Sequence, residues 1–371
     1  MLQPITPQAL PPTDLNWSRL VPEIGRANRS LAAYGVMLEA IPNPAVLLSP
    51  LTTKEAVLSS KIEGTVATLG DVLEFEAGEL PTDPARTEDI REVLNYRSAL
   101  RAAEKELPRR PFSLSMLKAL HGILMKGVRG DSKTPGQFRM TQNWIGPKGC
   151  SLEEASFIPP IPATLAEHLE AWESFYRSDQ PDPLVQLAIV HAQFEIIHPF
   201  NDGNGRIGRI LIPIFLFEKK ILRRPMYYLS EWLEAHREDY IERLRALGTR
   251  PDAWNDWAAF FLQGIDEQAA KNTETARRIL ALKEHLQARI IELTHSQYAA
   301  PLLDQLFRLV VFERRQLDFG KRAPTGQAVY NLLNVLVENG ILKVHRQGRG
   351  RRSTVYVFAE LVNICEGREI V

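Results

Sequence analysis

Residues 198–209, His-Pro-Phe-Asn-Asp-Gly-Asn-Gly-Arg-Ile-Gly-Arg, combine a titratable base, a carboxylate, a Gly-Asn-Gly turn and two arginines within one short stretch. An apolar run, Ile210 to Phe217, follows at once and predicts that this stretch is a loop entering a buried helix. His198 can exchange a proton near neutral pH, because the unperturbed pKa of histidine is about 6.5. These are the parts needed to hold a nucleoside triphosphate and to deprotonate a nucleophile beside it.

The glycines and arginines of this stretch favour an anion site. Gly203 and Gly205 carry no Cβ, so backbone amides can approach an anion closely. A helix that begins near Asn204 or Gly205 has unpaired first amides with partial positive charge, which suits a phosphate. Arg206 and Arg209 share a helical face. Cations in a first turn oppose the helix dipole, so their position favours service to a bound polyphosphate.

Two common nucleotide motifs are excluded by the same residues. The stretch lacks the Gly-x-x-x-x-Gly-Lys-[Ser/Thr] pattern of a Walker A loop, and no strand-rich βαβ pattern surrounds it as in a dinucleotide fingerprint.

Asp202 is a hard oxygen ligand at the phosphate end, and Mg²⁺ is often held by one or two carboxylates together with substrate phosphates. Each feature alone is usually structural, and it is their order and close spacing that favour a catalytic site.

Residues 198–209 match the signature His-Pro-Phe-x-[Asp/Glu]-Gly-Asn-Gly-Arg-x-x-Arg at every specified position, so the chain resembles the Fic family. The resemblance implies transfer of a nucleotide monophosphate, usually AMP from ATP, to a Ser, Thr or Tyr hydroxyl of a protein target, which can be the chain itself. It implies that His198 deprotonates the target hydroxyl and that Asp202 binds Mg²⁺. It assigns the α- and β-phosphates to Gly203, Asn204 and Gly205, the β-phosphate also to Arg206, and the γ-phosphate to Arg209.

A second motif lies far upstream. Residues 59–64, Ser-Ser-Lys-Ile-Glu-Gly, resemble the Fic inhibitory motif [Ser/Thr]-x-x-x-Glu-[Gly/Asn]. The resemblance implies that Glu63 pairs with Arg209 and takes the place of the γ-phosphate, on an inhibitory helix that also carries Ser59. An ordinary structural interpretation is that Ser59 caps a turn and that Glu63 is an exposed helix acid.

Residues 136–160 are predicted to form a short hairpin, because β-prone residues stand between Gly and Pro punctuation. An exposed edge of such a hairpin can pair with an extended peptide. The segment resembles the flap of Fic proteins, which implies that Phe157, Ile158 and Pro159 position the target. The alternative is an ordinary surface hairpin.

The composition limits the class of protein and the compartment that can be expected. The chain has 371 residues, with 45 basic and 45 acidic side chains and a formal net charge of zero, which gives no overall case for nucleic-acid or membrane binding. Two cysteines, Cys150 and Cys365, favour a reducing compartment without a disulfide framework. The apolar run 210–217 is too short to span a membrane. We therefore expect a cytoplasmic protein.

The helical periodicity and the proline punctuation predict a mainly α fold. The resemblance implies a Fic-type helical core with a β-hairpin flap. The expected domains are an N-terminal helical region with the inhibitory helix (1–110), a catalytic core (111–265), a connecting helix (266–295) and a winged-helix-like domain (296–371).

The last of these domains has a pattern of its own. An amphipathic helix from Thr325 to Glu338 precedes two strand-like segments, 341–344 and 354–358, and the arrangement resembles a winged helix. Its hairpin is basic and could contact phosphates; the residues concerned are Lys343, Arg346, Arg349, Arg351 and Arg352. Winged helices also serve as protein-contact or dimer modules, so DNA contact, protein contact and a homodimer all stay open.

Three functions are compatible with these motifs. The leading one is a protein adenylyltransferase that Glu63 inhibits, with Tyr227, Tyr228 and Tyr240 as candidates for the pocket of the base, although such aromatics are more often core residues. A second is a DNA-binding regulator whose nucleotide site only senses. The third is removal of AMP from a modified target, with Glu63 positioning water.

Overall fold

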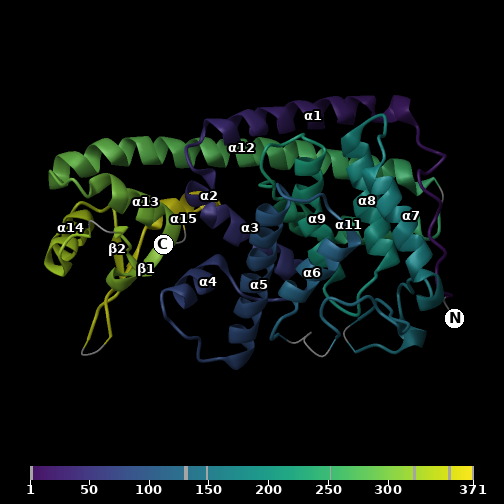
Figure 1. Cartoon of the computed structure of the whole chain (residues 1–371), viewed down its shortest axis with the longest axis horizontal. Coiled ribbons are helices and arrows are strands. Elements are labelled where there is room, and N and C mark those ends of the chain that lie inside the picture. Colours follow the sequence, from purple (N-terminus) through teal and green to yellow (C-terminus); the bar gives the residue numbers. More distant parts are fainter. Residues whose placement is uncertain are drawn as a thin grey trace. The chain divides into compact units, whose positions relative to one another are not determined.

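The computed structural model describes residues 3–128, 133–147, 149–250, 252–320, 323–349 and 352–369. Arg351 of the predicted basic hairpin lies outside these residues. Within them the chain is mainly helical with one small sheet (Figure 1), which confirms the predicted fold class. Two compact units form: unit 1 comprises residues 1–35, 58–65 and 94–270, and unit 2 comprises residues 36–57, 66–93 and 271–371.

Four helices contribute residues to both units: α1 (Trp17–Ala40), α3 (Ser49–Ile62), α5 (Pro84–Glu106) and α12 (Ala253–Thr294). Unit 1 also contains α6 (Leu114–Leu124), α7 (Leu165–Arg177), α8 (Pro183–Ile197), α9 (Asn204–Glu218), α10 (Ser230–Ala235) and α11 (Arg237–Leu247), with short 3₁₀ turns η1 (Leu152–Glu154) and η2 (Pro162–Thr164). The expected connecting helix is part of α12, which begins earlier than predicted because its apolar first half packs into unit 1. None of the helices in the described ranges is both long and apolar enough to cross a bilayer.

Helix α8 is the centre of unit 1. It packs against α7 and α9, and nearly all of its residues are buried, as expected for a helix that is apolar around its whole circumference. Two buried indoles donate to its backbone: Trp172 Nε1 to the Val190 carbonyl at 2.9 Å and Trp257 Nε1 to the Ala188 carbonyl at 2.8 Å. The direction of α8 and the place where it ends are therefore fixed from several sides.

The start of α8 is fixed by a side-chain cap. Asp182 Oδ1 accepts from the amides of Leu184 and Val185, both at 2.9 Å, and Pro183 occupies the first helical position. Asn28 donates to the second carboxylate oxygen of Asp182 at 3.1 Å. This cap joins α8 to α1 within unit 1.

Within the described part of the predicted hairpin, an antiparallel bridge joins Ile145 and Phe157. Pro159 and Pro160, which follow the bridge, have no amide hydrogen to donate to a longer ladder. The segment before α1, the N-terminal arm, supplies a further contact: the Ile5 amide donates to the Ile158 carbonyl at 3.0 Å.

Unit 2 contains the only sheet found among the described residues. The strands β1 (Val311–Glu313), β2 (Lys343–Arg346) and β3 (Val355–Val357) are antiparallel in the order β1-β3-β2. The helices are α2 (Pro44–Leu47), α4 (Leu69–Glu76), α13 (Ala299–Leu309), α14 (Gly326–Glu338) and α15 (Ala359–Glu366), and a 3₁₀ turn η3 (Arg314–Gln316) follows β1. The sequence predicted α14 and the two later strands but not β1.

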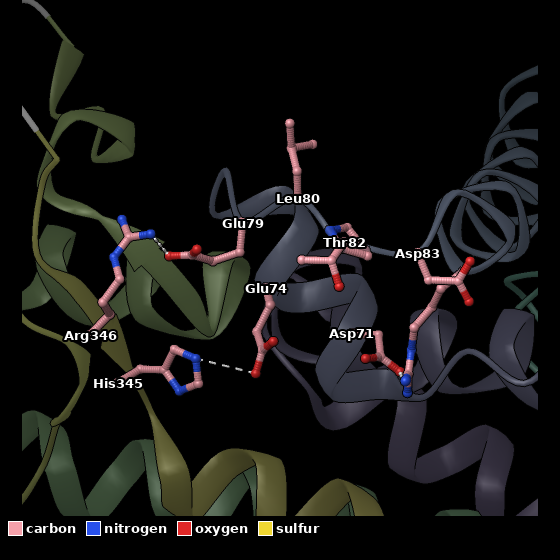
Figure 2. A pocket seen from close by; sticks show the side chains of 10 residues that line it. Asp71, Glu74, Glu79, Leu80, Thr82, Asp83, His345 and Arg346 are labelled. Carbon is pink, nitrogen blue, oxygen red and sulfur yellow. Dashed lines mark hydrogen bonds and ion pairs between the residues drawn. The ribbon is translucent and has the colours of Figure 1, made fainter.

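Two basic side chains of β2 face acids of α4 and the segment that follows it. His345 Nε2 lies 3.3 Å from Glu74 Oε1, and Arg346 pairs with Glu79 (Figure 2). These residues line a cavity of about 470 Å³ whose other charged walls are mainly acidic. Part of the basic charge predicted for this hairpin is therefore already paired inside unit 2.

Replacing Asp182 with Ala should lower the free energy of unfolding by about 1–2 kcal/mol, because two amides at the start of α8 lose their acceptor. Urea unfolding measures the change. Asp179→Ala is the matched control, since the Asp179 side chain is fully exposed and lies 3.9 Å from Lys219. Equal losses in the two variants would contradict the capping role.

Candidate functional site

The loop between α8 and α9 is closed by its own asparagine. Asn204 Oδ1 accepts from the Phe200 amide, and Asn204 Nδ2 donates to the Phe200 carbonyl, both at 2.8 Å. The chain reverses through left-handed conformations at His198 (φ 48°) and Gly203 (φ 77°). A Cβ at Gly203 would lie 2.8 Å from Met125 Sδ, so this turn needs glycine for space as well as for its φ. The result is a helix, α9, whose N-terminus opens onto the loop.

The His198 ring is oriented by the last turn of α8. Its Nδ1 lies 3.2 Å from the Glu195 carbonyl oxygen, which can only accept, so Nδ1 carries the hydrogen and Nε2 keeps a lone pair. Burial lowers the pKa of His198 to about 4, although the Glu195 carbonyl and nearby acids act in the opposite direction. The ring is therefore a neutral base at physiological pH, with Nε2 ready to accept a proton.

Arg139 ties this loop to the predicted flap. Its guanidinium is buried and donates to four carbonyls, including His198 at 3.0 Å and Pro160 at 2.5 Å. Burial lowers the pKa of Arg139 to about 10. Gln142 adds a second tie, since its Nε2 donates to the Pro159 carbonyl at 3.0 Å. The structure thus holds the flap residues 157–159 beside the His198 loop.

A second histidine supports the acidic end of the loop. The Gly136 amide donates to His121 Nδ1 at 2.8 Å, so His121 Nε2 carries the hydrogen and donates to the Asp202 carbonyl at 3.0 Å. The His121 ring also stacks on Phe200 with a centroid distance of 3.7 Å. Burial lowers the pKa of His121 to about 4, which keeps this arrangement neutral.

The carboxylate of Asp202 stands at the mouth of the site. Its side chain is 44% exposed, accepts from the Gly203 amide at 2.6 Å and lies 3.5 Å from Arg206 Nη2. Across the described parts of the chain, no three His, Cys, Asp or Glu side chains gather closely enough to hold a metal ion. Asp202 fits Mg²⁺ as a single protein ligand, with the other ligands coming from phosphates and water.

Arg209 and Glu63 form the main ion pair of the site. Arg209 is buried, donates from Nη2 to Glu63 Oε1 at 2.7 Å, and makes two 2.8 Å hydrogen bonds to the hydroxyl and the carbonyl of Ser59. A Cβ at Gly205 would lie 2.2 Å from Glu63 Oε1, so this carboxylate rests on the first turn of α9. Burial alone would raise the pKa of Glu63, but Arg209 outweighs it and the pKa is lowered. A carboxylate therefore lies at the N-terminal end of α9.

A third carboxyl group, Glu195, lies close to the same guanidinium. Its Oε1 is buried and accepts no hydrogen bond from the described residues. A Cβ at Gly208 would lie 2.1 Å from this oxygen, so α8 and α9 are in close contact here. Burial raises the pKa of Glu195 to about 8, while Arg209 opposes the rise and Glu63 adds to it. Glu195 is thus largely protonated at neutral pH.

The structure brings one group of the predicted site residues together at the start of α9 and places the candidate tyrosines in buried positions. The first group consists of His198, Asp202, the turn 203–205, Arg206, Arg209, Ser59 and Glu63. Of the tyrosines, Tyr227 donates to the Ile265 carbonyl and Tyr240 bonds to His191, and both are buried, as is Tyr228. Sequence reasoning missed Arg139, His121, Glu195 and His191. The spacing of His191, Glu195 and His198 along one helix face could have indicated the last two.

Glu195→Gln should stabilise the protein increasingly as pH rises from 5 to 8. Between its ordinary pKa of 4.5 and its folded value of about 8, the folded state holds a proton that the unfolded state has lost, so wild-type stability falls with rising pH. The slope is at most about 1.4 kcal/mol per pH unit. Chemical unfolding at several pH values measures it, with Glu170→Gln on the exposed face of α7 as the control. A gain independent of pH would contradict the buried proton.

Two family models match the chain: the Fic/DOC family N-terminal model over residues 21–105 and the Fic/DOC family model over residues 111–216. Together they cover about half of the sequence, and the loop geometry described above belongs to the second. The chain is a member of the Fic family.

Two proteins named as adenylyltransferases are similar to this chain over shorter stretches. A probable protein adenylyltransferase of Aquifex aeolicus (strain VF5) is 35% identical over 85 residues, which is 23% of this chain and 27% of that protein. The protein adenylyltransferase Fic of Drosophila grimshawi is 28% identical over 159 residues, which is 42% of this chain and 31% of that protein. The matches therefore span about a third or less of the length of these relatives.

Solved structures show the same fold at low identity. A Fic family protein from Desulfovibrio desulfuricans G20 matches with a TM-score of 0.58 and 19% identity, covering 96% of this chain and 98% of that one. A Fic-domain-containing signaling protein from Bacteroides thetaiotaomicron VPI-5482 matches with a TM-score of 0.53 and 18% identity, covering 68% of this chain and 96% of that one. At these identities, the similarity shows a shared fold alone.

Proposed function

We propose that this protein transfers AMP from ATP to a hydroxyl group of a protein and that Glu63 restrains the reaction. One observation carries the proposal: a neutral His198, whose Nε2 keeps a lone pair, stands in the same closed loop as the N-terminus of α9. A base and an anion site held together in one loop suit attack of a hydroxyl on a phosphorus atom. Relatives named protein adenylyltransferases support the choice of AMP as the transferred group.

Each residue of the site has a separate role in the proposed reaction. His198 Nε2 takes the proton of the target hydroxyl as its oxygen attacks the α-phosphorus, and the bond to the bridging oxygen of pyrophosphate breaks. The first amides of α9 receive the phosphates, with Arg206 toward the β-phosphate and Arg209 toward the γ-phosphate. Asp202 would hold Mg²⁺, which neutralises phosphate charge when bound.

Inhibition follows from competition for one cation. Glu63 lies against Gly205 and pairs with Arg209, where the γ-phosphate is expected. ATP with its γ-phosphate in this place must displace the carboxylate. Because Arg209 is buried, it exchanges one anion for another and is not left alone.

The flap residues Phe157, Ile158 and Pro159 are proposed to align the target segment. Arg139 and Gln142 fix this strand beside His198, which is what strand addition requires. The Ile158 carbonyl already accepts from Ile5, so a target must pair along the flap at other backbone groups or displace the N-terminal arm.

Glu63→Gly should raise AMP transfer by about tenfold or more, since loss of about 1.4 kcal/mol of competing interaction changes an equilibrium tenfold. The measurement is incorporation of label from α-labelled ATP into the protein itself or into added protein, with intact-mass analysis to identify the donor. Lys61→Gly is the matched control, because it alters the same end of α3 without touching the pair. Equal rates of AMP transfer in Glu63→Gly and wild type would contradict inhibition by Glu63.

In the Glu63→Gly protein, His198→Ala should abolish transfer while ATP binding persists. Label that persists without His198 would rule out its role as the base. Release of AMP from a modified protein by wild type, lost in Glu63→Gly, would instead favour removal of AMP by hydrolysis.

Chelation of divalent metal, or Asp202→Asn, should lower transfer by Glu63→Gly roughly a hundredfold, since charge neutralisation at phosphates is worth several kcal/mol. Asn keeps the oxygen that accepts from the Gly203 amide, so the loop should stay closed. Full activity of Asp202→Asn at low Mg²⁺ would show that this carboxylate does not bind the metal.

A further inference from the structure

The C-terminal end of α3, the helix that precedes the inhibitory carboxylate, is held by side chains from elsewhere in unit 1. The last four carbonyls of a helix have no partner inside it. In α3, two of these four accept from amides of the turn 63–65. The Ser59 carbonyl accepts from Arg209. The Ile62 carbonyl accepts from Arg237, a residue to which the proposed reaction gives no task.

Arg237 binds the Ile62 carbonyl through two nitrogens. Its Nε lies 3.2 Å and its Nη2 3.1 Å from this oxygen, so one edge of the guanidinium donates both of its hydrogens there. A cation beside the last carbonyls of a helix is also favoured by the helix dipole. The carbonyl belongs to the peptide group that joins Ile62 to Glu63, and that group is planar. Arg237 therefore holds the plane that contains the Glu63 Cα.

The place of Arg237 in its own helix is unfavourable. It is the first residue of α11, where the helix dipole favours acids such as the following Glu238 and Asp239. A cation in this position gains more from the C-terminal end of α3 than from α11. The bond to the Ile62 carbonyl thus gives a physical reason for an arginine here.

A second contact joins the same helix ends but is weaker. Lys61 pairs with Glu234 of α10 at 2.8 Å, and the Lys61 side chain is 53% exposed. Exposed ion pairs contribute little to stability, because water and salt screen them. Arg237 is therefore the more important of these two contacts.

The contacts of Arg209 do not replace this support. Its two bonds to Ser59 lie one helical turn before Glu63 and are not the ones that a γ-phosphate would replace. They hold the body of α3, whereas the Arg237 bonds act on the peptide group that carries Glu63. The two arginines thus support different parts of the same helix end.

We infer that Arg237 is a positioning residue for inhibition, which keeps the Glu63 carboxylate on Arg209 by fixing the peptide group before Glu63. The inference rests on the proposed function, in which Glu63 competes with the γ-phosphate of ATP. Arg237 is exposed and belongs to α11. The activity can therefore be controlled from a residue outside the loop 198–209, with Glu63 itself unchanged.

Arg237→Ala should raise AMP transfer about three- to tenfold, because the net contribution of such hydrogen bonds is modest. Binding of Mg²⁺–ATP should tighten to a similar extent, whereas binding of Mg²⁺–ADP, which lacks the γ-phosphate, should change less than twofold. Isothermal titration calorimetry measures both affinities. Arg237→Lys, which keeps a donor but not the two-nitrogen contact, should give an intermediate rate.

The decisive comparison places Arg237→Ala in the Glu63→Gly protein. No carboxylate is left to hold there, so the substitution should change neither the rate of AMP transfer nor the ATP affinity by more than twofold. Thermal unfolding of each variant without nucleotide measures any loss of stability. Partial unfolding lowers a rate, so it cannot produce the expected rise.

Arg243→Ala is the matched control. Arg243 also belongs to α11 and also donates to a main-chain carbonyl, that of Asp256 at 3.4 Å. Its guanidinium lies 5.0 Å from the centre of the Phe260 ring. Arg243→Ala should leave AMP transfer at the wild-type rate.

The outcomes separate the inference from the proposed function. No rise in Arg237→Ala, an equal rise in Arg243→Ala, or a rise that persists undiminished in the Glu63→Gly protein would overturn the positioning role. The proposed inhibition would still stand if Glu63→Gly alone exceeds the wild-type rate. A Glu63→Gly protein no more active than wild type would overturn inhibition by Glu63, and the inference with it. A rise confined to proteins that retain Glu63 supports the inference.

Discussion

The buried guanidinium of Arg209 is the constraint around which the site is built. A buried cation without a counter-charge is destabilising by about 3–5 kcal/mol, so some anion must lie beside it in every state of the protein. In this structure the anion is Glu63, with Ser59 satisfying two further hydrogens. Under the proposed mechanism a phosphate takes the same place. Inhibition and substrate binding are then two ways of satisfying one electrostatic requirement.

The other titratable groups around Arg209 are neutral for a separate reason, their burial. His198, His121 and His191 are kept uncharged mainly by burial, and Glu195 is kept protonated by the same cause. Net charge at the start of α9 is thus confined to the arginines, Glu63 and Asp202. Under the proposed mechanism, a triphosphate entering this region would meet these cations and the first amides of α9, and it would displace Glu63 from Arg209.

Much of the site could be predicted from sequence, because its residues are contiguous or belong to a recognisable second motif. His198, the turn 203–205 and Arg209 are close in the chain, so local geometry alone brings them together. Arg139 and His121 could not be predicted in the same way. Their partners are backbone carbonyls and amides of distant loops, and backbone atoms leave no signature in the sequence.

His191 shows the limit most clearly. A single histidine in an apolar helix is ordinarily a core residue with a satisfied ring, and the sequence gives no means of knowing which groups satisfy it. The partners come from α9 and α11, which are placed by tertiary packing. The flap illustrates a different limit: its bridge between Ile145 and Phe157 was expected, but how far pairing would extend depended on which amides the prolines remove.

The nearly complete burial of α8 fixes the surroundings of His191. Helices α7 and α9 and the indoles of Trp172 and Trp257 hold α8 in place, and the His191 ring bonds to the Gly208 carbonyl and the Tyr240 hydroxyl. A surface helix with the same histidine would exchange its partners with water, and its ring would change between tautomers. Burial therefore turns ordinary hydrogen bonds into directional ones, and these bonds join α8, α9 and α11 behind the loop.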